Sequence, residues 1–196
     1  MANQDAPFGF RQVGGLGSRP TSEGTSKYTI ASGFADSIYA GDIVEAGAGT
    51  SEGGTAIAAG YVGNAAATSS ARNLGIFNGC FYTDPTTSKP TFKNYWPASV
   101  AAEAQAFVYD NPDDLFEVQA EGTLVQATVA RAVDMAYTAG STINGRSKEE
   151  ISVTAGADLA VRVIRISGDP ANSDIGSANA NWIVKFNEHI YYNYST

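Results

Sequence analysis

The sequence of 196 residues has very little of what metal sites, disulfides and membrane spans require. It contains one cysteine, Cys80, and one histidine, His189, so it cannot form an internal disulfide and lacks the ligand clusters of a zinc site. No apolar run approaches the roughly 20 residues that cross a bilayer. The first ten residues lack the basic and apolar segments of a signal peptide. We therefore expect no cofactor, no metal and no membrane partner.

Charged side chains are also scarce, and most of them are acidic. They make up 16% of the chain, whereas soluble domains average about 25%. Twelve basic residues against twenty acidic ones give a net charge of −8. Binding to nucleic acid requires Lys and Arg to displace counterions from phosphates. We therefore expect no nucleic-acid partner, and the low charge indicates that much of the surface contacts other subunits.

What the sequence does contain is a series of short apolar runs separated by turn residues. Such a series, with 21 glycines, is typical of short strands in an all-β protein. We predict a compact sandwich or barrel of short strands, with an extended N-terminal arm and at most one or two short helices. The arm is residues 1–27, although the same composition also fits a disordered terminus, and the single β-rich domain is residues 28–196. The expected strands include residues 28–30, 37–40, 43–44, 74–77, 80–82, 92–96, 106–109, 115–120, 159–166 and 182–186.

Three segments carry more specific local signals. Asn78-Gly79 interrupts an apolar run and favours a tight hairpin or a bulge. In residues 159–166 the apolar phase shifts by one residue at Ile164, which indicates a bulge. Residues 123–133 are the best helix candidate, with Thr123 as a cap, but a strand fits nearly as well.

The sequence offers few groups for catalysis. His189 lies in an aromatic segment, where a packing or interface role is favoured over that of a catalytic base. The glycine-rich residues 14–19 match no phosphate-binding motif. Asp110, Asp113 and Asp114 fit a solvated turn better than a calcium loop, and Glu149-Glu150 fits a solvated loop face better than an acid–base pair. We expect no catalytic residues and no enzymatic activity.

Aromatic side chains are the remaining signal. Most of them are expected in the core, but those near the C-terminus can line a protein interface, where Tyr is enriched. A platform for carbohydrate would use the same residue types. The candidates for an oligomer interface are His189, Tyr191, Tyr192 and Tyr194.

Six stretches of this sequence together resemble the head decoration, or cement, proteins of tailed bacteriophages and their prophages. The resemblance extends from about residue 9 to residue 192, although residues 46–71 contribute nothing to it. The stretches are Gly9–Arg11, Gly75–Tyr82, Tyr95–Pro97, Phe107–Pro112, Leu115–Gln119 and Trp182–His189.

This resemblance implies a non-enzymatic structural protein that is assembled in the host cytoplasm and located on the outer surface of the virion head. Its partners would be the major capsid protein and its own copies, arranged as a trimer that stabilises the expanded capsid. The arm, through Phe8, Phe10, Arg11 and Val13, is the expected capsid contact. The alternatives are a head-fibre or tail-associated glycan-binding protein and a small hydrolase that uses His189.

Overall fold

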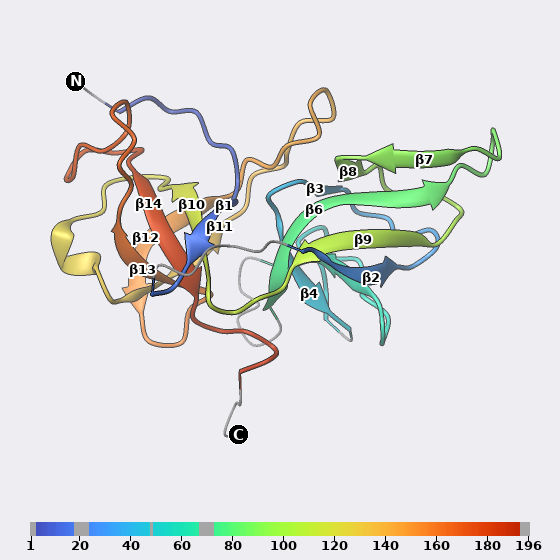
Figure 1. Cartoon of the computed structure of the whole chain (residues 1–196), viewed down its shortest axis with the longest axis horizontal. Coiled ribbons are helices and arrows are strands. Elements are labelled where there is room, and N and C mark those ends of the chain that lie inside the picture. Colours follow the sequence, from blue (N-terminus) through green and yellow to red (C-terminus); the bar gives the residue numbers. More distant parts are fainter. Residues whose placement is uncertain (1–2, 18–23, 48, 67–72, 193–196) are drawn as a thin grey trace.

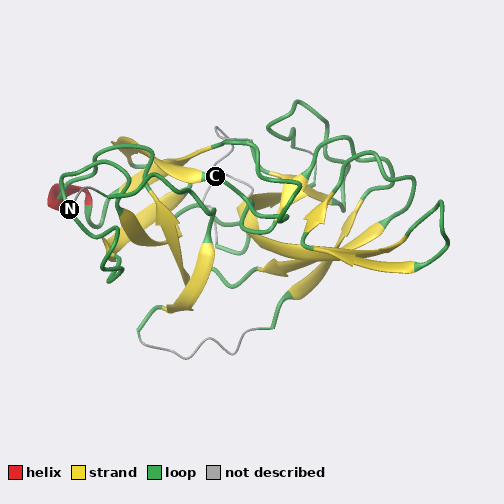
Figure 2. Cartoon of the chain, turned by 90° about the horizontal axis from the view of Figure 1, so that it is seen from above, coloured by secondary structure: helices red, strands yellow, loops and turns green. Residues whose placement is uncertain are grey.

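The computed structural model describes residues 3–17, 24–47, 49–66 and 73–192. The chain is almost entirely β, and its antiparallel sheets pack as a compact sandwich rather than a closed barrel. This confirms the predicted fold class. Within the described residues the one helical element is a single 3-10 turn, η1 (Gln126–Thr128), which lies at one end of the molecule (Figure 2).

The first sheet, sheet A, has six strands in the described part of the chain. Their spatial order runs from the N-terminal strand to a strand near residue 150, and both of these are edges. The strands in this order are β1 (Arg11–Gly15), β10 (Asp114–Gln119), β14 (Asn181–Phe186), β13 (Val161–Ile166), β11 (Ala132–Ala136) and β12 (Glu150–Gly156).

The second sheet, sheet B, lies beside sheet A along the long axis of the molecule (Figure 1). Its strands in spatial order are β2 (Ser26–Ile30), β9 (Ala104–Tyr109), β6 (Asn73–Thr83), β4 (Ile43–Ala46) and β5 (Val62–Asn64). The short strand β7 (Pro90–Lys93) pairs with the second half of β6. A separate pair is formed by β3 (Ile38–Tyr39) and β8 (Tyr95–Trp96).

Two apolar cores hold the sandwich together, and strands β4 and β6 contribute to both. Successive side chains of a strand point to opposite faces, so neighbours along these strands are sent to different cores. Ile43 and Ile76 pack in the sheet A core with Trp182 and other residues. Val44 and Phe77, each the next residue along, pack in the sheet B core. The parts of β4 and β6 that carry these residues are therefore buried on both faces.

The N-terminal segment is extended, as predicted, but it runs along its own chain. Figure 1 shows it crossing the end of sheet A before it enters β1. Asn172 Oδ1 accepts a hydrogen bond from the backbone N–H of Gln4 at 2.8 Å, and Gln119 Oε1 accepts one from Ala6 at 3.0 Å. β1 then pairs with β10. Residues 3–15 are thus held on sheet A, whereas residues 26–27 already belong to β2 of sheet B.

The local predictions had mixed outcomes. Asn78 and Gly79 form a bulge within the single long strand β6, where the pairing with β9 shifts between Phe77 and Cys80. A bulge also occurs in β13 between Val163 and Arg165, as the apolar phase indicated. The helix at residues 123–133 is wrong, because only Gln126–Thr128 is helical and strand β11 begins at Ala132.

Candidate interaction surfaces

The four residues predicted to contact a capsid have different surroundings. Phe10 is only 3% exposed and belongs to the sheet A core, so the prediction that it is a surface contact is wrong. Phe8 is half-buried, and the Arg11 guanidinium lies 5.1 Å from the centre of its ring. Arg11 also forms an ion pair with Glu117. Val13 is exposed, so Arg11 and Val13 remain available at the surface.

Val13 belongs to an exposed apolar area around the edge strand β1, which we call the β1 surface. The register with β10 steps from Gln12 to Gly14, so Val13 is the bulged residue and has no direct partner. A bulge re-aims its side chain, and Val13 is 45% exposed. Leu16, which follows the strand, is 42% exposed. A shallow hollow of about 380 Å³ adjoins them, lined by Val13, Leu16, Leu115, Ile164, Arg165 and the glycines between Val13 and Ser18.

The C-terminal candidates for an oligomer interface lie beyond the end of β14. His189 is fully buried, so it cannot contact another subunit, and that prediction is wrong. Its ring packs against Phe186 at 5.2 Å and Tyr191 at 5.5 Å between ring centroids. Tyr191 and Tyr192 are exposed by 57% and 36%. Tyr194 lies outside the described residues.

Hydrogen bonds hold these two tyrosines against their own chain. Tyr192 donates a hydrogen bond of 2.6 Å to Asp113, and the Tyr191 and Tyr28 hydroxyls are 2.7 Å apart. Tyr28 donates in turn to Asp110 at 2.6 Å. Burial and the bond to Asp110 raise the pKa of Tyr28. The acidic turn therefore fixes the C-terminal segment.

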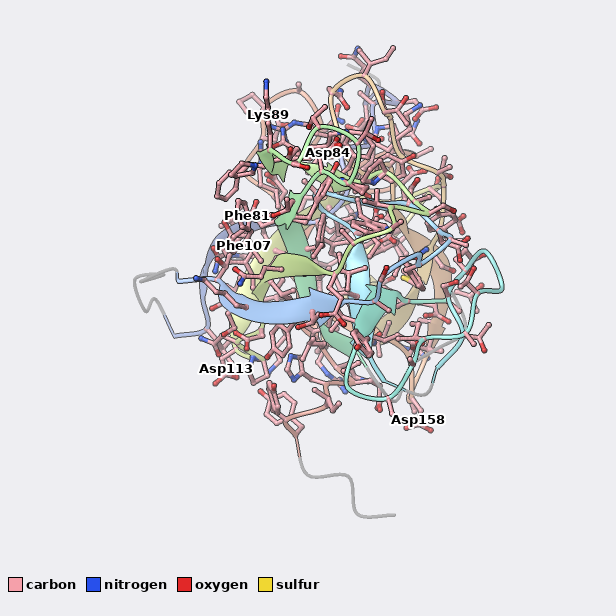
Figure 3. All side chains as sticks on the ribbon, turned by 90° about the vertical axis from the view of Figure 1, so that its right-hand side faces the viewer. Phe81, Asp84, Lys89, Phe107, Asp113 and Asp158 are labelled. Carbon is pink, nitrogen blue, oxygen red and sulfur yellow. The ribbon has the colours of Figure 1, made fainter. Side chains whose placement is uncertain are left out.

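A different aromatic surface, which the sequence reading missed, lies on the outer face of sheet B. Phe81, Phe92 and Phe107 come from β6, β7 and β9, and we call them the phenylalanine ladder. The Phe92 ring lies 4.5 Å from that of Phe81 and 6.3 Å from that of Phe107. Phe92 is 72% exposed. Figure 3 shows Phe81 and Phe107 close together on one side of the strands.

Charged side chains of both signs surround the phenylalanine ladder. Lys27 is directly opposite Phe107 in the pairing of β2 with β9. Lys89 and Asp84 lie at the turn between β6 and β7, above the ladder in Figure 3. Glu103 lines a shallow hollow of about 280 Å³ that borders Phe81. Lys93 of β7 also lies close enough for its charge to act on Asp84. The surroundings of the ladder thus carry charges of both signs, whereas the chain as a whole is acidic.

The carboxyl groups of Asp42 and Glu149 are buried together. Asp42 lies between β3 and β4, and Glu149 directly precedes β12. Both side chains are fully buried, so the expectation that Glu149 lies on a solvated loop is wrong. Asp42 Oδ2 accepts a hydrogen bond from the Tyr39 backbone N–H at 2.7 Å, and Glu149 Oε2 accepts one from that of Ile43 at 2.9 Å. Burial raises the pKa of Asp42, and burial and the charge of Asp42 raise that of Glu149. Protonation of either carboxyl group relieves their repulsion.

In the described part of the chain, no cluster of three or more His, Cys, Asp or Glu side chains is arranged to hold a metal ion. The same residues include no helix long and apolar enough to cross a bilayer. Comparisons with models of protein families, with curated proteins and with solved structures each find no match. The exposed surfaces are therefore the basis for a functional proposal.

Proposed function

We propose that this chain is a non-enzymatic decoration protein, which binds the outer surface of an expanded phage head as a homo-oligomer and stabilises it. The sequence resemblance suggested this role, and the β1 surface is the observation that supports it best. It combines an edge strand with two exposed aliphatic side chains, Val13 and Leu16, beside a hollow. An edge strand can add a strand from another protein, and the adjoining side chains give that contact its specificity.

The proposed contact changes the role assigned to the N-terminal segment. Phe10 anchors the segment in the core, while Arg11 and Val13 face outward from it. The shell would meet a preformed surface instead of a free arm, so little conformational entropy would be lost on binding. Because a ligand that binds only one state stabilises that state by mass action, binding restricted to the expanded head would make expansion harder to reverse.

The experiment compares virus particles purified from cells in which the gene is intact, disrupted or replaced by a variant. Cryo-electron microscopy should show density for this chain on the outside of heads from the intact gene alone. The paired change Val13→Asp and Leu16→Asp should abolish that density, since it places two charges in an apolar contact. Val125 is similarly exposed but flanks η1 at one end of the molecule (Figure 2), so Val125→Asp is the control and should retain the density. Heads of equal appearance with and without the gene would contradict the proposal.

The structure gives less support to a glycan-binding head fibre or tail protein. The exposed tyrosines that suggested a sugar platform use their hydroxyls in bonds to Tyr28 and Asp113. A hydrolase based on His189 has less support still, because that ring is enclosed by aromatic side chains of its own chain.

A further inference from the structure

The phenylalanine ladder is unusual for the surface of an isolated chain. Three aromatic rings on adjacent strands expose apolar area in one place, and Phe92 keeps 72% of its surface in contact with solvent. Single exposed apolar residues are common, but grouped aromatic rings are typical of interface centres. The ladder also stands on strand pairs of fixed register, Phe81 with Phe92 and Phe107 with Lys27, so its shape is set before any partner arrives.

The charges around the ladder indicate what kind of partner fits it. The chain carries a net charge of −8, so two copies repel one another over most of their surfaces. Around the ladder this repulsion is reduced, because Lys27, Lys89 and Lys93 offset Asp84 and Glu103. A second copy can meet these lysines with its own acids. A two-fold interface between identical subunits requires a patch that is complementary to itself, and patches that meet at a three-fold axis must likewise tolerate their own copies.

We propose that copies of this chain associate through their phenylalanine ladders, which meet at the symmetry axis of the oligomer. The stacked rings form its apolar centre, and the lysines of one copy face Asp84 and Glu103 of another. This inference deepens the proposed function, since it assigns the surface that builds the homo-oligomer. It also leaves the β1 surface, which belongs to the other sheet, free for the shell.

The test is the mass of the isolated protein in solution, measured by light scattering and by sedimentation over a range of concentrations. Wild-type protein should form a dimer or trimer. Phe92→Ser should raise the dissociation constant by at least about tenfold, as expected at the centre of an interface. Val125→Ser removes another exposed apolar side chain, beside η1 at one end of the molecule (Figure 2), and should leave association unchanged.

A second variant examines the charged rim without altering the rings. Changing Lys27 and Lys89 together to Glu gives every copy an acidic rim, so association should weaken at low salt and recover partly at high salt through screening. Circular dichroism and thermal unfolding confirm that each variant is folded. A monomeric wild type, or an oligomer that both variants leave intact, would overturn the inference. Loss of shell binding by a chain that still associates would count against the proposed function alone.

Discussion

The Glu149 carboxylate accepts a hydrogen bond of 2.9 Å from the backbone N–H of Ile43, which joins the edge of sheet A to the first residue of strand β4 in sheet B. Glu149 immediately precedes β12, and it is fully buried beside Asp42. A carboxyl pair in this position makes the junction between the two sheets sensitive to pH. Four predictions follow from this junction and from other buried groups.

Asp42→Asn should stabilise the protein at alkaline pH. Burial raises the folded-state pKa of Asp42 from 3.8 to about 7, so the folded state binds more protons than the unfolded state between these values. The contribution of Asp42 to folding stability is therefore present at low pH and is lost as the pH rises through about 7. Asparagine keeps an acceptor for the Tyr39 N–H and removes the charge. We expect a gain of about 1 kcal/mol at pH 8, or roughly 2–4 °C in Tm.

The matched control for this change is Asp158→Asn, at an exposed carboxyl group (Figure 3). Thermal unfolding is measured from pH 5 to pH 8 for the wild type and both variants. The Tm of the Asp42 variant should rise relative to that of the wild type as the pH rises. The Tm difference between the Asp158 variant and the wild type should stay constant. An Asp42 variant that is less stable than the wild type throughout this range would show that the buried charge of Asp42 does not destabilise the folded protein.

His189→Asn should reduce the loss of stability in acid. Burial lowers the pKa of His189, and its Nδ1 accepts a hydrogen bond from the Tyr191 N–H at 3.2 Å. As the pH falls, the unfolded state therefore takes up a proton on His189 before the folded state does. The stabilisation of the fold by neutral His189 is complete above the ordinary pKa of 6.5 and is lost as the pH falls below it. Asparagine supplies an acceptor that does not titrate here. The protection factor of the Tyr191 amide, which corrects the hydrogen-exchange rate for its intrinsic pH dependence, should fall in acid for the wild type only. An equal fall in both proteins would refute the idea.

Gly9→Ala should destabilise the fold by about 3 kcal/mol. Gly9 has a φ of +74°, and a Cβ there would lie 2.4 Å from the Cβ of Ser147 and 2.9 Å from the Gly41 carbonyl oxygen. Gly17 has the same φ, but among the described residues no atom lies within 4 Å of such a Cβ. Gly17→Ala therefore measures the backbone strain alone, for which we expect about 1 kcal/mol. Denaturant unfolding gives both values, and equal losses would contradict a close crossing at Gly9.

The Cys80 thiol should be unreactive in the folded protein. It is 1% exposed, and burial raises its pKa to about 12, so the nucleophilic thiolate is almost absent at pH 8. A thiol reagent such as dithionitrobenzoate should react within seconds in denaturant and only through unfolding in buffer. Rapid reaction of the native protein would show that the sheet opens locally around β6.

The sequence was informative where a signal depends on neighbouring residues. The phase shift at Ile164 predicts its bulge because side chains alternate along any strand, whatever pairs with it. At residues 123–133 the local signal was misleading, because the cap and the spacing indicated a helix that does not form. There, the backbone N–H of Val163 bonds to the Arg131 carbonyl at 3.0 Å, and this long-range pairing outweighs the helical spacing.

The interaction surfaces depend on the register between distant strands, and register is not local information. Phe81, Phe92 and Phe107 look like ordinary strand residues until β7 and β9 are placed on either side of β6. The same applies to Phe10, which is buried only because β1 joins sheet A. Composition indicated an associating surface, but it could not distinguish the ladder from the C-terminal tyrosines.

Strand β6, with its 11 residues, has a mechanical consequence. It carries Phe81 near one end and Ile76 near the other, and it pairs with β4, β7 and β9 along its length. A pull on the ladder directed along β6 would load these hydrogen bonds together, in shear. They would then break as a group instead of one after another, so the strand can transmit tension from the ladder into the junction between the sheets.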